Sequence, residues 1–122
     1  MKERSVHNAI SGLLAQKLKK FSDESKALNV LTCTQIYTEI FECISEIIKE
    51  TEMPLCNESV NYIAQQYYDA VLINGNQELN PNIFTQRAKL ENIQTKEIAL
   101  LAMMFKGTDF SFPLLAEIKK RS

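Results

Sequence analysis

The chain has 122 residues, of which 45% are hydrophobic and 24% charged, and its formal net charge is −1. This composition indicates one globular domain, residues 1–122, and excludes a disordered protein, which would hold fewer apolar residues and more net charge. The three cysteines form no C-x-x-C pair and the single histidine is distant in sequence, so we expect neither a disulfide framework nor a zinc site. The N-terminus lacks the apolar stretch of a secretory signal and no segment is long enough to span a bilayer, so we expect a cytoplasmic protein with no membrane partner.

The first predicted helix spans Ser5–Lys20. Its apolar residues recur at helical spacing, and lysines in its last turn complement the helix dipole. Gly12 lies inside this helix, where glycine costs roughly 1 kcal/mol relative to alanine, so we interpret it as a point of close helix crossing. The only histidine, His7, is interpreted as a surface residue near a mobile start. The next stretch, Ala27–Cys33, fits either a short helix or a buried extended segment, and we favour the helix.

The second predicted helix spans Thr34–Thr51 and stops before Pro54. Its isoleucines and aromatic residues share one face at the helical period, which favours an amphipathic helix over a strand. The opposite face carries four acids: Glu39, Glu42, Glu46 and Glu50. A solvated helix face is the usual explanation of such a row. The alternative is an acidic strip that docks a basic partner.

The third predicted helix begins at the capping residue Asn57 and ends at Ile73, before Asn-Gly. Its core stripe faces one way, while Tyr62 and Ile73 project from the far side among polar residues that include Gln66. Two large apolar or aromatic residues on a polar face indicate a second contact surface. A short fourth helix is predicted over Pro81–Leu90, because Asn-Pro is a typical helix start.

The stretch Ile98–Phe105 contains eight consecutive apolar residues. A helix over residues 95–106 would therefore be apolar on every side and would need burial all round. Thr95 is the expected N-cap, and Gly107 is the expected left-handed residue after the C-terminus. We predict that this is the central helix of the domain.

A last helix is predicted over Phe112–Arg121, with Ser111 as its cap and three basic residues in its final turn. Several apolar side chains are expected to pin this end of the chain to the core: Phe110, Phe112, Leu114, Leu115 and Ile118.

Known catalytic arrangements are missing from the sequence. A single histidine near the N-terminus argues against a Ser-His-Asp or Cys-His catalytic site, and the Glu-x-x-His pairs of a helical di-metal site are absent. No phosphate-binding glycine loop occurs either. We therefore expect no catalytic residue, no cofactor and no metal, which argues against an enzyme.

The sequence thus predicts an all-α fold, a bundle of five or six helices around a buried central helix at about 95–106. The expected function is a small non-enzymatic interaction or regulatory module that docks a still unknown protein through a helical surface, with a homodimer as one form. The predicted partner-binding residues are Tyr62, Gln66, Ile73, Glu39, Glu42, Glu46 and Glu50.

The alternative function is a nucleic-acid-binding transcriptional regulator. It would use basic residues near the fourth helix and the C-terminus: Arg87, Lys89, Lys119, Lys120 and Arg121. Against it stands the slightly acidic chain, whose pI is about 5.9, because nucleic-acid-binding domains usually carry a strongly basic surface.

Overall fold

The computed structural model describes residues 3–21, 30–73, 83–84 and 86–122. Within these ranges every regular element is helical, which confirms the predicted all-α class. The elements in chain order are α1 (Glu3–Lys17), the short 3₁₀ turn η1 (Leu18–Phe21), α2 (Val30–Thr51), α3 (Asn57–Ile73), the 3₁₀ turn η3 (Leu90–Asn92), α4 (Thr95–Met104) and α5 (Ser111–Arg121). None of these helices is long and apolar enough to cross a membrane.

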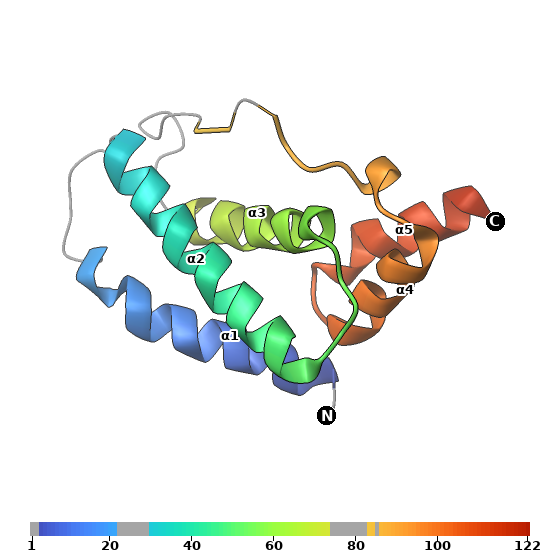
Figure 1. Ribbon diagram of the computed structural model, residues 1–122, viewed down its shortest axis with the longest axis horizontal. Coiled ribbons are helices and arrows are strands. Elements are labelled where there is room, and N and C mark those ends of the chain that lie inside the picture. Colours follow the sequence, from blue (N-terminus) through green and yellow to red (C-terminus); the bar gives the residue numbers. More distant parts are fainter. Residues whose placement is uncertain (1–2, 22–29, 74–82, 85) are drawn as a thin grey trace.

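The five α-helices form two groups in space. Helix α2 packs against both α1 and α3, and α4 packs against α5 and touches α1. Figure 1 shows α4 and α5 stacked together at one end of the molecule, beside the N-terminal end of α1. The helices therefore pack as a bundle in which α2 and α3, rather than α4, make the most extensive helix contact.

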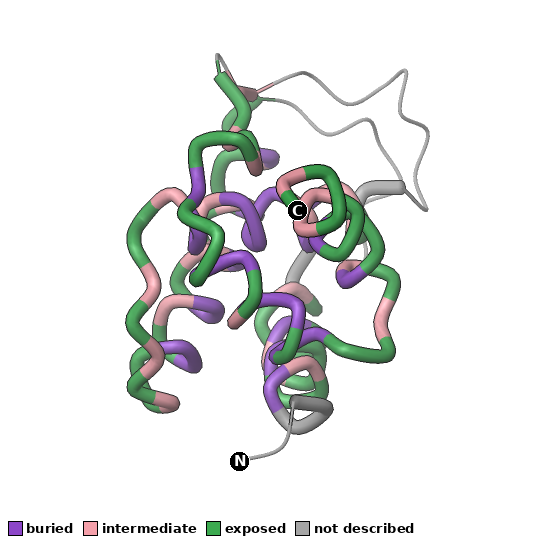
Figure 2. The backbone as a smooth tube through the Cα atoms, turned by 90° about the vertical axis from the view of Figure 1, so that its right-hand side faces the viewer, coloured by how far each residue is buried: buried purple, intermediate pink, exposed green. Residues whose placement is uncertain are grey.

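The core lies between these helices, and α2 supplies much of it. Its isoleucine face is buried as the helical period predicts, with Ile40 and Ile44 fully enclosed. In α1, Val6, Ile10 and Leu14 turn inward at the same spacing. Figure 2 shows the buried segments facing the space between the helices and the exposed ones lining the outside. Burial of one apolar face per helix is the main stabilising contribution to such a bundle.

Helix α4 is buried along one face only, which corrects the expectation of burial all round. Ile98 and Leu101 are fully enclosed, but Ala99 is exposed and Met103 is 56% exposed. The helix ends at Met104, and its cap position is Gln94 rather than Thr95, with no capping bond from the side chain. The expectation fails because an apolar run in the sequence does not show how many other helices will pack around it.

The expected left-handed residue after α4 is confirmed at Gly107, whose φ is 84°. By contrast, the interpretation of Gly12 as a crossing point is wrong. Gly12 is exposed on α1, and a methyl group added at its Cα would meet no atom within 4 Å.

The predicted helix over Pro81–Leu90 is wrong for the residues that the structure describes. Residues 83–84 and 86–89 are not helical, and Figure 1 shows this stretch passing over α3 before it enters η3. Side chains of α3 accept hydrogen bonds from two backbone N–H groups of this stretch. The Ala88 N–H donates to Gln65 Oε1 at 2.9 Å, and the Lys89 N–H donates to Glu58 Oε2 at 3.4 Å. These long-range bonds replace the intrahelical bonds that a local pattern would predict.

Candidate functional site

Tyr62 is buried in the structure, with 5% of its surface exposed, so its prediction as an exposed partner-binding residue is wrong. Glu58, Tyr62, Gln65 and Asp69 lie on one stripe of α3, because they are spaced three or four residues apart. The segment Arg87–Lys89 bonds to Glu58, Gln65 and Asp69. It therefore lies over the stripe and covers the side of α3 that the helical wheel leaves polar.

The other two residues predicted on α3 do not restore this surface. Gln66 is half-buried, and the side chain of Ile73 lies outside the described residues.

The acidic face of α2 is where the sequence predicted it. Glu42, Glu46 and Glu50 are exposed and lie one turn apart, while Glu39 is half-buried and already makes an interaction within the chain. Burial raises the pKa of the Cys43 thiol on this helix; Lys17 lowers that pKa, and the neighbouring glutamates raise it further. The thiol therefore stays protonated and acts as a small core residue rather than a nucleophile.

The structure holds two of the five predicted nucleic-acid-binding residues in contacts inside the chain. Arg87 forms an ion pair with Asp69, Nη2 to Oδ2 at 2.5 Å, and its guanidinium lies 5.1 Å from the centre of the Phe84 ring. Arg121 bonds through Nε to Glu117 at 2.9 Å and through Nη2 to the Leu90 carbonyl oxygen at 2.8 Å. The remaining three, Lys89, Lys119 and Lys120, are exposed.

Helix α5 presents an exposed apolar face that the sequence interpretation missed. Phe112 is 66% exposed and Leu115 is 52% exposed, which corrects the expectation that both pin the helix to the core. Leu114, on the opposite face, is fully buried, and the half-buried Ile118 packs against the core beside it. The helical wheel could have separated these two faces, because Phe112, Leu115 and Lys119 share one side at i, i+3 and i+7.

Ser111 positions the start of α5, although not as the expected cap. The cap position is Phe110, and Ser111 is the first helical residue and is buried. Its hydroxyl donates to the Thr108 carbonyl oxygen at 2.8 Å, while the Thr108 hydroxyl donates to the Phe105 carbonyl oxygen at 2.6 Å. These two bonds fix the short turn between α4 and α5. The exposed face of α5 therefore begins at a defined point.

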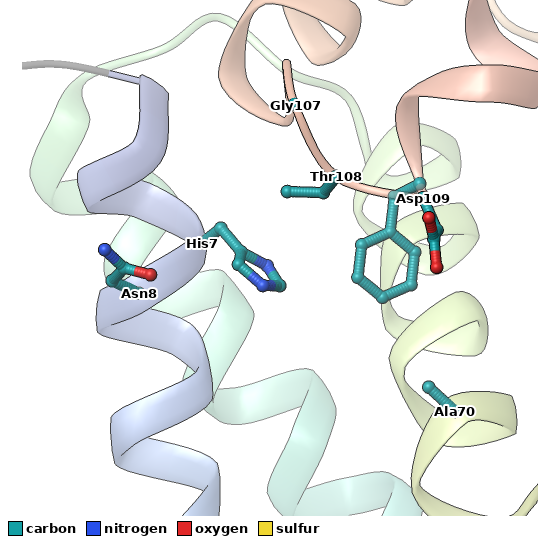
Figure 3. A pocket seen from close by; sticks show the side chains of 7 residues that line it. His7, Asn8, Ala70, Gly107, Thr108 and Asp109 are labelled. Atoms are coloured by element: carbon teal, nitrogen blue, oxygen red, sulfur yellow. The ribbon is translucent and has the colours of Figure 1, made fainter.

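A cavity of about 530 Å³ lies between α1, α3 and the α4–α5 turn. It is lined by His7, Asn8, Ala70, Gly107, Thr108, Asp109 and Phe110. Figure 3 shows the His7 imidazole pointing from α1 across this space toward the turn that carries Thr108 and Asp109. The volume falls within the range of small-molecule sites, about 300–1,000 Å³.

His7 is half-buried and belongs to an aromatic cluster, so the interpretation as a surface residue holds only in part. Its Nδ1 lies 2.6 Å from the Tyr67 hydroxyl, and its ring centre is 5.8 Å from those of Tyr67 and Phe110. Burial raises the pKa of Tyr67 well above its usual range, so the hydroxyl keeps its proton. The hydrogen bond between the Tyr67 hydroxyl and Nδ1 joins α1 to α3 beside the cavity.

No group of three or more histidine, cysteine or acidic residues in the described part of the chain could hold a metal ion. Comparison with known proteins gives no match: no family model, no curated protein and no solved structure is similar to this chain. Site residues are therefore assigned from the structure alone. The exposed face of α5, the acidic face of α2 and the cavity beside His7 are the three candidate sites.

Proposed function

We propose that the chain is a small non-enzymatic interaction module that docks a partner helix on the exposed face of α5. The observation that carries this proposal is the pair Phe112 and Leu115, both more than half exposed on one side of a regular helix. Single exposed apolar residues are normal on protein surfaces, but neighbouring large ones on one helix face are typical of docking sites. Phenylalanine is also among the residues enriched in protein interfaces.

The partner that fits this face is an amphipathic helix with apolar residues followed by acidic ones. Lys119 and Lys120 continue the exposed side of α5 beyond Leu115. The exposed residues of α5 include no acid, so the face runs from apolar to basic. Rim charges of this kind mainly set the association rate and the choice of partner. A second copy of this chain offers an acidic surface of this kind, because α2 carries an exposed row of acids.

The test compares two apolar-to-polar changes at similar exposure. The double variant Phe112→Gln/Leu115→Gln alters the proposed face, and Met103→Gln alters an exposed methionine on α4 as a matched control. Each protein is produced with a tag in its own cells and isolated together with any bound partner. Gel filtration then measures the mass of the complex. We expect the wild type and Met103→Gln to elute above the 14.0 kDa of the single chain, and the double variant to elute as the free chain.

A double variant that keeps the complex would overturn the α5 proposal. Charge reversal at Lys119 and Lys120 is the second arm, and it should weaken the complex more at low salt than at high salt. Purified wild-type protein is measured alongside. If the purified protein elutes at twice the single-chain mass, the partner is a second copy. If it elutes at the single-chain mass, the partner in the cell is a different protein.

The acidic strip of α2, defined as Glu42, Glu46 and Glu50, is proposed as a second contact for a basic partner. Its support is the exposure of all three side chains on a well-formed helix. The triple change to glutamine keeps the size of each side chain and removes the charge. A complex that survives this change but is lost in the α5 double variant would leave α5 as the sole docking face.

Nucleic-acid binding stays the weaker proposal, because Arg87 and Arg121 are engaged within the chain. Of the five predicted nucleic-acid-binding residues, the three exposed lysines, Lys89, Lys119 and Lys120, would remain to neutralise phosphates. Fluorescence anisotropy of a DNA duplex at about 50 and about 200 mM salt tests it, since phosphate contacts weaken steeply over this range. Salt-sensitive binding that is lost in Lys119→Glu/Lys120→Glu would revive it.

A further inference from the structure

The cavity beside His7 has a composition that the docking proposal does not use. Its described lining residues include one carboxylate, Asp109, and no lysine or arginine. Aromatic surface is provided by the half-buried Phe110, whose ring centre lies 4.5 Å from that of Tyr67. The cavity thus combines a negative charge with part of the Phe110 ring.

This combination selects among ligand classes. A metal ion is not favoured, because the described part of the chain offers no cluster of three ligands. An anion would meet the Asp109 carboxylate, and the described lining has no lysine or arginine to offset that repulsion. An organic cation gains from both groups, since ammonium and guanidinium groups are attracted to aromatic faces as well as to carboxylates.

We propose that this cavity binds a small organic cation, a guanidinium or alkylammonium group, between the Asp109 carboxylate and the Phe110 ring. The Thr108 hydroxyl donates its proton to the Phe105 carbonyl oxygen, so it has no proton left to donate to a ligand. The His7 imidazole also lines the cavity, so its ring signals report on a bound ligand. The cation is either a free amine or an arginine or lysine side chain of another protein.

The single histidine makes this proposal directly measurable. Because the chain has one His, the ring signals of His7 in a carbon–proton correlation spectrum need no further assignment. The protein is titrated at neutral pH with ethylguanidinium chloride, and sodium chloride at equal concentration corrects for ionic strength. We expect a saturable shift of the His7 signals with ethylguanidinium, of millimolar affinity, and no saturable shift with sodium acetate.

Asp109→Asn is the informative variant, because Asp109 is exposed and its replacement does not disturb the core. It should weaken the affinity for ethylguanidinium by roughly two- to fivefold, the range expected of a solvent-accessible charge pair. Glu91→Gln, an exposed carboxylate on η3, is the matched control and should leave the affinity unchanged.

Three results would overturn the proposal: no saturable shift with ethylguanidinium, an equal shift with acetate, or an affinity that Asp109→Asn leaves intact. A short acetylated peptide with one arginine distinguishes the two sources of the cation. Tighter binding than ethylguanidinium would identify a protein side chain, and equal binding would identify a free small molecule. Neither result depends on α5, so failure of this site and failure of the docking face are separable through Phe112→Gln/Leu115→Gln.

Discussion

Glu97 Oε1 accepts a hydrogen bond from the Ser59 hydroxyl at 2.7 Å, so a carboxylate of α4 holds the first turn of α3. The same oxygen accepts the Cys56 backbone N–H at 2.8 Å. Glu97 is buried, and negative charge is favourable at a helix N-terminus, where backbone N–H groups have no partner within the helix. The residue is therefore a capping group supplied from a distant part of the chain, and it joins α3 to α4.

Replacement of Glu97 by alanine should lower the free energy of unfolding by about 2–3 kcal/mol, because it leaves the buried Ser59 hydroxyl and the Cys56 N–H without an acceptor. Glu97→Gln keeps an acceptor oxygen and should cost about half as much. Urea unfolding followed by far-ultraviolet circular dichroism measures both. Glu50→Ala, at an exposed position, is the control and should change stability by less than about 0.5 kcal/mol.

Glu97 should also contribute to the acid sensitivity of the fold. Burial raises the pKa of its carboxyl, but the bonds from Cys56 and Ser59 outweigh burial, so the pKa lies below the ordinary value of 4.5. A carboxyl whose pKa is lower in the folded state stabilises the fold above the unfolded value, and this contribution is lost as the pH falls through the folded value. The urea midpoint of wild type should therefore fall more steeply below about pH 4.5 than that of Glu97→Gln. Parallel curves for the two proteins would contradict this account.

The one-sided burial of α4 predicts opposite outcomes for two neighbouring changes. Leu101→Asp places a carboxylate at a fully buried position, which should cost about 4 kcal/mol or more and prevent stable folding. Met103→Asp alters an exposed position, and it should cost no more than about 1 kcal/mol, mainly through helix propensity. Thermal unfolding distinguishes the two. Loss of the fold in both variants would show that α4 is enclosed on all sides.

Gly12→Ala should stabilise the protein by about 0.5–1 kcal/mol. Alanine has the higher helix propensity, and the added methyl group meets open space on α1. The expected result is a higher urea midpoint with an unchanged slope. A destabilised variant would indicate that another helix approaches α1 at this point after all.

Helix positions could be predicted where one face of the helix is clearly apolar. The third helix was predicted over the same residues that α3 occupies, and the isoleucine face of α2 is buried as expected. The start of α2 is not defined by the sequence, because the apolar residues around Val30 fit more than one local structure. It begins at Val30, and Ala27–Asn29 lie outside the described residues.

The errors share a physical cause, which is long-range contact. The Arg87–Lys89 segment is held by side chains of α3, and no local pattern reports that Tyr62 lies beneath it. His7 meets Tyr67 across 60 positions of sequence, and Glu97 meets Cys56 across 41. Such pairs are fixed by the packing of helices, so they become visible only when the fold is known.

The exposed side of α5 is a different case, because the helical period of the sequence is enough to predict it. Leu114 and Leu115 are adjacent in sequence, so they point to different sides of a helix. Apolar character alone led to the expectation that both are buried. The candidate docking face was therefore present in the pattern, whereas the cavity beside His7 was not.

The placement of the tyrosines allows near-ultraviolet circular dichroism to follow the packing of one part of the fold. The chain has no tryptophan, and its four tyrosines, Tyr37, Tyr62, Tyr67 and Tyr68, all lie on α2 and α3. Tyr37 and Tyr68 contact Phe84, whereas Tyr67 contacts Phe105 and Phe110 at the α4–α5 turn. Near-ultraviolet circular dichroism therefore observes the packing around α2 and α3, while far-ultraviolet signals count every helix. A far-ultraviolet loss that precedes the near-ultraviolet one would show that helical structure is lost while the packing around the tyrosines is still ordered.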